Sequence, residues 1–205
     1  MTKHPIRSFG LAAVALVAAA SLASAAPETL RIDPNHSNVG FSIRHLFARV
    51  NGRFTGYEGT VAFDAAAPAA SSVDVTIQAA SITTQNDTRD KDLRSDNFFD
   101  VAKYPTLTFK STRVERKGKD AFVLHGDLTI KGVTKPVQLP FQIAGAVKDP
   151  WGNTRFGIEA QTKINRRDFG INYGNAFAGG LDVGNEVTIS LRLEAVQPGT
   201  KPAGE

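Results

Sequence analysis

Apolar residues recur at every second position through most of this chain. Between Ser37 and Arg44, the apolar Val39, Phe41 and Ile43 alternate with small or polar residues. Successive side chains of a β-strand point to opposite faces, so this period predicts strands with one apolar and one polar face. The alternation continues at these later positions: Val73, Val75, Ile77, Leu107, Phe109, Phe122, Leu124, Leu128, Ile130, Val137, Leu139, Phe141, Ile143, Val147, Phe156, Ile158, Ile164, Val187, Ile189, Leu191 and Leu193. One apolar face per strand favours an all-β, antiparallel sheet covered on a single side, because parallel strands are apolar almost throughout.

Turn-forming residues separate the alternating stretches at intervals of about ten residues. Lys117–Asp120 and Asp149–Asn153 both contain residues suited to chain reversal. The pattern predicts about eight or nine strands of roughly 7 to 12 residues, including a short first strand over Thr29–Ile32. Strands this long, joined by short turns, favour a closed barrel over a sandwich, although alternation by itself is compatible with both.

Two segments interrupt the alternation. Asp87–Arg94 has acidic residues early and a basic residue at its end, and Asn86 or Asp87 is suited to cap it. We therefore expect a short helix here, which must end before Tyr104-Pro105. The second segment, Arg166–Asn185, is rich in glycine and asparagine and too long for a plain hairpin turn, so it predicts a lid, rim or binding loop.

The first 25 residues have the features of an export signal. Lys3 and Arg7 precede an apolar run over Leu11–Leu22, and the small residues Ala23-Ser24-Ala25 provide a cleavage site. The run is shorter than the ~20 apolar residues of a membrane span, which favours a cleaved signal peptide over an uncleaved anchor. We expect residues 1–25 to be removed and residues 26–205 to form a single β-barrel domain without stable membrane insertion.

Composition narrows the possible functions. Without the two basic residues of the signal, 22 of the 24 Lys and Arg remain against 20 Asp and Glu, which is too even to favour nucleic acid as a partner. The chain has no cysteine, which excludes disulfides, thiolate metal sites and a cysteine nucleophile. Thirteen phenylalanines against one tryptophan and three tyrosines predict a bulky interior that is nearly free of polar groups. A solidly packed core and a cavity are both compatible with this composition.

Residues for catalysis or metal binding are sparse. No His-Glu-x-x-His, Gly-x-Ser-x-Gly or phosphate-loop motif occurs. His125 belongs to the polar face of its strand and is expected on the surface, and His36 follows Asp33-Pro34-Asn35 and is expected to bond backbone groups at a turn. His45 is a candidate for contact with a ligand head group. A hydrolase with His36 or His45 as general base remains an alternative without an evident nucleophile, so we expect no enzymatic activity.

The acidic residues around the predicted helix do not form a calcium motif. A calcium loop needs a glycine at its sixth position and a closing glutamate, and neither is present. We therefore expect no metal site and no cofactor, with the following side chains solvated: Asp87, Asp90, Asp92, Asp96 and Asp100.

Several segments resemble the YceI-like family. They are His36–Leu46, Arg94–Val101 with Tyr104-Pro105, Leu128–Val137, Asn165–Gly170 and Val183–Val187, and together they cover nearly the whole chain after the signal. The resemblance implies a lipocalin-like antiparallel β-barrel, periplasmic in bacteria, that binds polyisoprenoids such as isoprenoid quinones or prenyl phosphates. It also implies a frequent homodimer and no catalysis. Phe98-Phe99 and Gly132 are expected to be structural, pinning the helix to the barrel and shaping a hairpin.

These observations define a carrier hypothesis with a tail site and a head site. The barrel interior is expected to hold an isoprenoid tail at Phe41, Ile43, Phe109, Phe122, Leu124, Phe141 and Phe156. Groups near the rim are expected to meet the head: Arg44, His45, Arg166, Arg167 and Tyr173. Arg166 and Arg167 with Asp168 fit either an ion pair at the rim or a clamp on an anionic head. The alternative is a secreted stress or interaction protein with a filled barrel and a glycine-rich loop that binds a protein partner.

Overall fold

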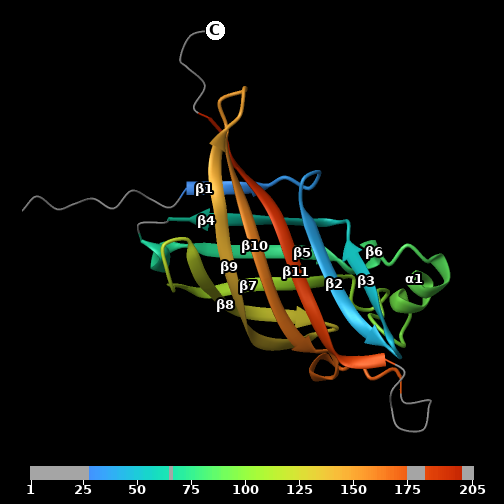
Figure 1. Ribbon diagram of the computed structural model, residues 1–205. Coiled ribbons are helices and arrows are strands. Elements are labelled where there is room, and N and C mark those ends of the chain that lie inside the picture. Colours follow the sequence, from blue (N-terminus) through green and yellow to red (C-terminus); the bar gives the residue numbers. More distant parts are fainter. Residues whose placement is uncertain (1–27, 65–66, 175–182, 200–205) are drawn as a thin grey trace, which may run out of the picture.

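The computed structural model describes residues 28–64, 67–174 and 183–199, so the predicted signal peptide lies outside the described residues. Within those ranges the chain is mostly β-strand, with one α-helix and three short 3-10 helices (Figure 1). The strands are β1 Glu28–Ile32, β2 Asn38–His45, β3 Ala48–Phe54, β4 Tyr57–Phe63, β5 Ser72–Gln78, β6 Ile82–Thr83, β7 Thr106–Arg116, β8 Ala121–Ile130, β9 Val133–Lys148, β10 Thr154–Asn165 and β11 Val183–Gln197. The helices are η1 Pro68–Ala70, η2 Ala79–Ser81, α1 Asp87–Arg94 and η3 Arg166–Phe169. None of the described helices is long and apolar enough to cross a membrane.

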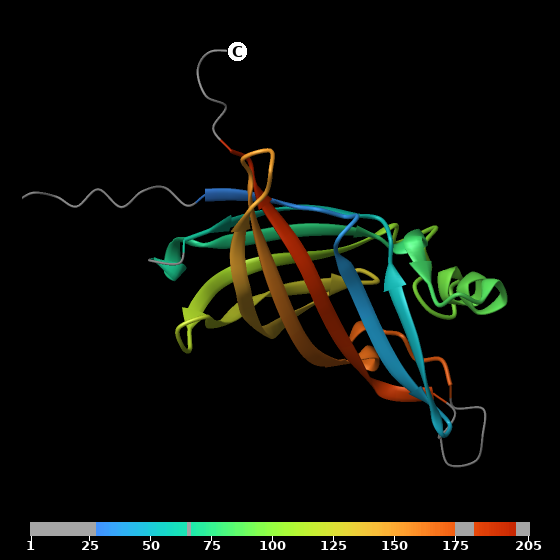
Figure 2. The same ribbon diagram turned by 45° about the horizontal axis from the view of Figure 1, so that its top comes forward.

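The strands close into a barrel. In the described part of the chain, β1, β4, β5, β7, β8, β9, β10 and β11 are neighbours in that order, and β11 pairs back with β1 to complete an antiparallel ring of eight. Beyond β1, β2 continues along the same edge of β11, and β3 and β6 extend the sheet from it. Figure 2 shows the sheet curving round on itself. The predicted antiparallel barrel is confirmed, and the sandwich alternative is excluded by the β1–β11 pairing.

Three of the long strands are broken in the middle. β1 leads into β2 through Asp33–Ser37, β3 leads into β4 at Thr55-Gly56, and β5 leads into β6 through η2. The second and third breaks lie side by side, because Gln78 N donates to Gly56 O (2.8 Å) and Thr55 N donates to Ser81 O (3.2 Å). Each broken strand therefore bends with its neighbour while its backbone groups keep partners.

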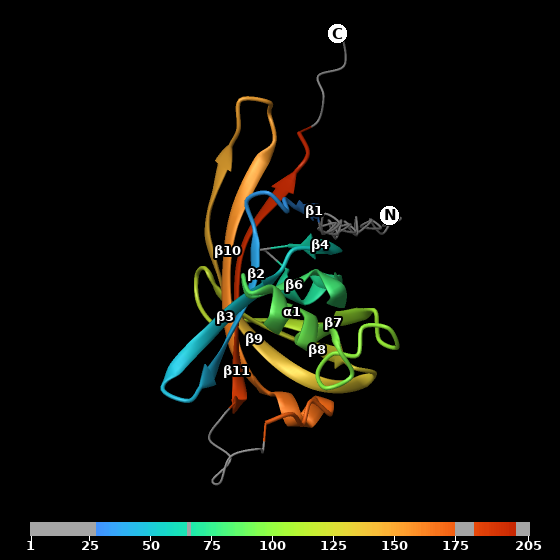
Figure 3. The same ribbon diagram turned by 90° about the vertical axis from the view of Figure 1, so that its right-hand side faces the viewer.

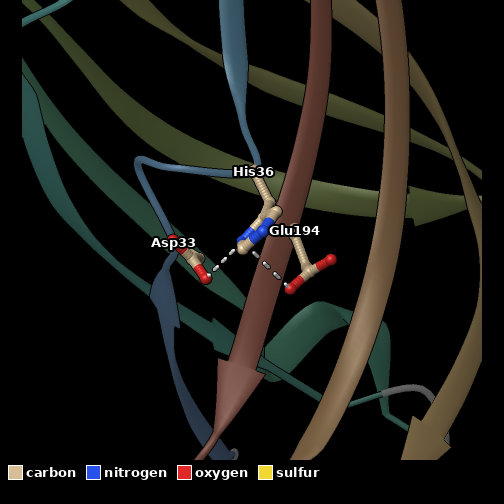
Figure 4. Close-up of side chains that lie close together, drawn as sticks. All are labelled: Asp33, His36 and Glu194. Atoms are coloured by element: carbon tan, nitrogen blue, oxygen red, sulfur yellow. Dashed lines mark hydrogen bonds and ion pairs between the residues drawn. The ribbon is translucent and has the colours of Figure 1, made fainter.

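An ion-pair network holds the first break against the barrel wall. Asp33 Oδ2 lies 2.9 Å from His36 Nδ1, and Figure 4 shows these two side chains beside Glu194 of β11. Arg155 of β10 lies with NH1 3.1 Å from Asp33 Oδ2 and also pairs with Glu194 and with Asp149. The hydrogen bond from His36, with help from the Asn35 amide and Arg155, outweighs partial burial and lowers the pKa of Asp33 to about 2. The same hydrogen bond raises the pKa of His36.

The predicted helix and turns are confirmed. α1 begins after Asn86, whose side chain accepts a hydrogen bond from Arg89 N (3.0 Å), and it ends at Arg94. Lys117–Asp120 joins β7 to β8, and Asp149–Asn153 joins β9 to β10. α1 lies at one end of the barrel, as Figure 3 shows when that end faces the viewer.

One residue of the predicted apolar face points outward. Val147 on β9 is 70% exposed, although alternation from Ile143 places it inside. The reason is a β-bulge: Gly157 of β10 pairs with Gly145, but the next residue, Ile158, pairs with Ile143. The extra residue reverses the alternation beyond that point, so Val147 lies opposite the outward-facing Arg155.

A tight turn between β8 and β9 depends on a glycine. Ile130 pairs with Val133, and the two residues between them, Lys131 and Gly132, both have positive φ. This is the backbone that a type I′ hairpin requires. A Cβ atom at Gly132 would lie 2.8 Å from Cε1 of Tyr104, which is too close. The positive φ and this short contact both disfavour a side chain at position 132.

We expect Gly132→Ala to lower the free energy of unfolding by about 1 to 3 kcal/mol, because it adds both backbone strain and a contact that is too short. Gly118→Ala is the matched control, since its Cβ would meet only Ala121 at 3.5 Å. Urea unfolding of both variants measures the difference, and equal stabilities would contradict this account of the turn.

We expect Asp33→Asn to lower stability near neutral pH by about 1 to 2 kcal/mol, after allowance for solvent screening. A carboxyl whose folded pKa lies below its ordinary value stabilises the fold above pH ~4 and loses that contribution as the pH falls toward 2. The variant should therefore lose less stability than the wild type on acidification. Asp127→Asn, at an exposed position of β8, makes the same charge change as a control. Parallel pH profiles for wild type and Asp33→Asn would refute the expectation.

Candidate ligand-binding cavity

The interior of the barrel contains a cavity of about 790 Å³. Sites for small ligands usually have volumes of ~300 to 1,000 Å³. The wall consists almost entirely of aliphatic and aromatic side chains from the inward faces of the strands. The interior is therefore not the solidly packed core that composition left possible.

Six of the seven residues predicted for the tail line this cavity. They are Phe41, Ile43, Phe109, Leu124, Phe141 and Phe156. Phe122, the seventh, is 2% exposed and does not contribute to the wall. Its ring packs behind the wall, stacked on Phe141 at 5.2 Å between centroids and edge-on to Phe63 at 5.4 Å.

An aromatic cluster lies where β4 ends and β8 begins. Phe63, Phe122 and Phe141 come from the ends of β4 and β8 and the middle of β9, and they meet across the interior. The guanidinium of Arg116 lies over the Phe122 ring at 4.9 Å and is held there by hydrogen bonds to Lys119 O and Gly118 O. A cation over an aromatic face is favourable, and here it covers the apolar cluster from the β7–β8 turn.

The opposite end carries the polar part of the lining. Residues at the start of α1 contribute here: Thr84, Asn86, Thr88, Arg89 and Asp92. Arg89 Nε donates to Thr84 Oγ1 (2.7 Å) and its NH2 donates to Thr84 O (3.1 Å), so the guanidinium is fixed in place. The sequence marked this segment only as a helix start, because nothing local to it shows which part of the barrel it covers.

Asp90 anchors the turn that precedes α1. It is 4% exposed, and its Oδ1 accepts hydrogen bonds from Thr84 N (2.8 Å) and Thr84 Oγ1 (2.6 Å). Burial raises the pKa of Asp90, but the hydrogen bonds from Thr84 outweigh that effect, so its pKa lies below the ordinary value. The expectation that the aspartates of this region are solvated is therefore wrong for Asp90.

Phe98 and Phe99 connect the helix to the barrel and also line the cavity. Phe99 packs edge-on to Phe54 of β3, with centroids 5.9 Å apart. Phe98 lies against Tyr173, with centroids 4.6 Å apart. The pair thus joins α1 to β3 and to the segment after η3, which is the structural role expected from the sequence.

Three of the five predicted head-group residues line the cavity: His45, Arg166 and Tyr173. Arg166 is 4% exposed rather than at an open rim. Its Nε donates to Gly184 O (2.8 Å) and its NH1 donates to Ile171 O (2.9 Å), which ties η3 to the start of β11. The buried guanidinium thus shapes this end of the cavity through backbone carbonyls.

Arg44 and Arg167 are not part of the cavity wall. Arg44 lies between Ile43 and His45, which both line the cavity, so alternation turns it to the outer face, where NH1 donates to Leu46 O (3.2 Å). Arg167 Nε donates to Asn185 Oδ1 (2.8 Å). Part of the predicted loop, residues 175–182, lies outside the described residues, so its role as a lid or rim stays a prediction.

The remaining histidines lie on the outside of the barrel. His125 Nε2 is 3.4 Å from Glu115 Oε2 on the polar face of the sheet. His36 belongs to the network of Asp33, Arg155 and Glu194. Asp33, His36 and Glu194 are the described residues that come closest to a metal-ligand set, with one ligand atom each within 4.8 Å of the others. Arg155 already places a positive charge between the two carboxylates, so the group is better explained as an ion-pair network.

Comparison with known proteins agrees with this architecture. A model of the YceI-like domain matches residues 30–195. Protein YceI of Escherichia coli O17:K52:H18 is 41% identical over 192 residues, which cover 92% of this chain and 96% of that protein. The crystal structure of BcnA from Burkholderia cenocepacia has a TM-score of 0.71 at 26% identity and covers 80% of this chain and 98% of its own.

A more distant structure shares the fold. A polyisoprenoid binding domain from Saccharophagus degradans, implicated in plant cell wall breakdown, has a TM-score of 0.62 at 17% identity, covering 84% of this chain and 99% of its own. The family match over most of the barrel and the close relationship to protein YceI lead to one conclusion. The chain belongs to the YceI-like family.

Proposed function

We propose that the protein is a periplasmic carrier that sequesters or transports a polyisoprenoid, either an isoprenoid quinone or a prenyl phosphate, and catalyses no reaction. The observation that carries the proposal is the apolar cavity of about 790 Å³ inside a closed barrel. An apolar cavity of this size stabilises an apolar guest because each buried methylene contributes ~0.8 kcal/mol of transfer free energy. Even after association costs, a partly enclosed isoprenoid tail retains substantial affinity.

The two ends of the cavity suggest the orientation of the guest. The tail points toward the aromatic cluster of Phe63, Phe122 and Phe141, where apolar side chains predominate in the wall. The head lies at the α1 end, where Arg89, Arg166 and His45 supply donors within an otherwise apolar wall. A guanidinium suits both phosphate and quinone oxygens as a donor.

The ligand class is supported by a structural relative. The Saccharophagus degradans domain with the same fold is described as polyisoprenoid binding. A branched, flexible hydrocarbon fits a long cavity lined with phenylalanine and β-branched side chains better than a rigid polycyclic ligand does. Residues 1–25, with their basic start, apolar run and small-residue site, support export as the route to the periplasm.

The arrangement of histidines supports binding over catalysis. His36 lies on the outer surface in an ion-pair network, away from the cavity. His45 lines the cavity, but within the described residues it has no hydrogen bond or ion pair that would orient it as a general base. The cavity also weighs against the alternative of a filled barrel that acts only as an interaction module.

We expect a long-chain prenyl alcohol or prenyl phosphate to raise the melting temperature of the delipidated protein by several degrees. At ~100 times the Kd a ligand that binds only the folded state adds about 3 kcal/mol. Ala160→Phe places a ring in the cavity and should weaken binding at least about tenfold, since Ala160 lines the wall.

Gln161→Phe is the matched control, because the neighbouring residue of β10 is exposed on the outer face. Differential scanning fluorimetry and titration calorimetry measure both effects. No thermal shift with any prenyl lipid, or equal binding by the two variants, would contradict the proposal.

A further inference from the structure

The hairpin of β2 and β3 carries an exposed apolar tip. His45 pairs with Ala48, so its loop consists of only Leu46 and Phe47. Phe47 is 105% exposed and Leu46 is 43% exposed. Figure 3 shows this hairpin projecting away from the body of the barrel, and nothing in the described fold covers its tip. Two adjacent large apolar side chains at a projecting tip are a feature of surfaces that meet an apolar partner.

The backbone at the tip makes these side chains more notable. Leu46 has a φ of 49°, in the left-handed region that favours glycine. The first residue of such a two-residue hairpin loop is ordinarily a glycine. A leucine with this φ is strained, and its exposed side chain contributes nothing to the core. Neither the stability nor the solubility of the protein therefore accounts for a leucine at this position.

The hairpin is also positively charged. From Pro34 to Tyr57 the chain contains Arg44, Arg49 and Arg53 and not one acidic residue. Arg49 donates to Ser42 Oγ (2.8 Å) and Thr188 Oγ1 (3.4 Å), which are uncharged partners. On the neighbouring β11, the carboxylate of Glu186 is already paired with Lys163 (2.8 Å). Arg49 therefore places a positive charge beside the apolar tip, and no acidic residue of the hairpin offsets it.

We propose that the tip formed by Leu46 and Phe47 docks the barrel onto an anionic phospholipid bilayer. An aromatic and an aliphatic side chain enter the interfacial region, while arginines beside them meet lipid phosphates. The proposal rests on the proposed carrier function, which requires lipid exchange with a membrane. His45, adjacent to the tip, lines the cavity, so docking would bring the polar end of the cavity close to the bilayer.

A second exposed aromatic residue provides an internal comparison. Trp151, 78% exposed, lies in the loop between β9 and β10, next to the acidic Asp149. Figure 2 shows that loop at the opposite extremity of the molecule from the β2–β3 hairpin. Both loops thus expose an aromatic side chain. They differ in charge, because the β2–β3 hairpin carries arginines and no acidic residue.

The test is sedimentation of the purified protein with vesicles of equal parts phosphatidylcholine and phosphatidylglycerol, and with vesicles of phosphatidylcholine alone. We expect binding to the anionic vesicles that weakens as salt is added. Phe47→Ser should weaken it about tenfold, and Arg49→Gln about fivefold. Leu46→Gly should also weaken binding, while its melting temperature stays equal or rises because glycine relieves the strained φ. Trp151→Ser should bind as the wild type does.

Binding of a prenyl alcohol in solution, measured on the same variants, separates this proposal from the carrier function. Normal prenyl binding without vesicle binding overturns the docking proposal alone. Vesicle binding that depends on Phe47, without prenyl binding, supports docking and refutes the carrier. Equal vesicle binding by wild type and Phe47→Ser, or an equal loss in Trp151→Ser, overturns docking. A dimer that Phe47→Ser dissociates in the absence of vesicles, with no binding to them, would instead assign the tip to a contact between two copies.

Discussion

Closure of the sheet through β1 and β11 is the interaction that lets the barrel keep an unfilled interior. The register is short, with Arg31 opposite Val196 and Ile32 opposite Ala195. Because β1 pairs with β11, the ring of eight strands is complete, and the open edge of the sheet lies outside this ring, on the extension formed by β2, β3 and β6. The strands therefore do not need a solid core to hold them in place, and inward side chains can line a cavity instead. The network of Asp33, His36, Arg155 and Glu194 stabilises the same junction from outside, where β1 turns into β2.

The polar side chains of the cavity wall gather mainly at one end of the barrel. At the other end, stacked phenylalanines lie beneath the guanidinium of Arg116. At the polar end α1 places Asn86 and Arg89 against the cavity, and Arg166 is held there by the carbonyls of Gly184 and Ile171. This difference fits a guest with an apolar tail and a polar head. The β2–β3 hairpin projects near the polar end, which links the proposed site to a surface from which lipid could be taken.

The sequence predicted the fold in detail because period-two alternation depends only on local geometry. It also predicted α1, whose cap at Asn86 is a local signal. Alternation also excludes one of the predicted pairs of head-group residues. Arg44 and His45 are adjacent in a strand, so they must face opposite sides of the wall. Val147 was misplaced because a bulge depends on the register of two strands, which no single strand reveals. Asp90 is buried through its hydrogen bonds to Thr84 in the turn before α1, and Phe122 lies outside the wall because it packs against Phe63 and Phe141 of other strands. Whether the barrel contains a cavity or a solid core depends on its diameter. The diameter is set by the stagger of the strands and cannot be predicted from composition.

Native mass spectrometry of the protein purified gently from its native host tests most directly whether the cavity is a lipid site. The account predicts a population heavier than the polypeptide by the mass of one prenyl lipid, released when the barrel unfolds. Polypeptide mass alone under conditions that preserve known lipid complexes would contradict it.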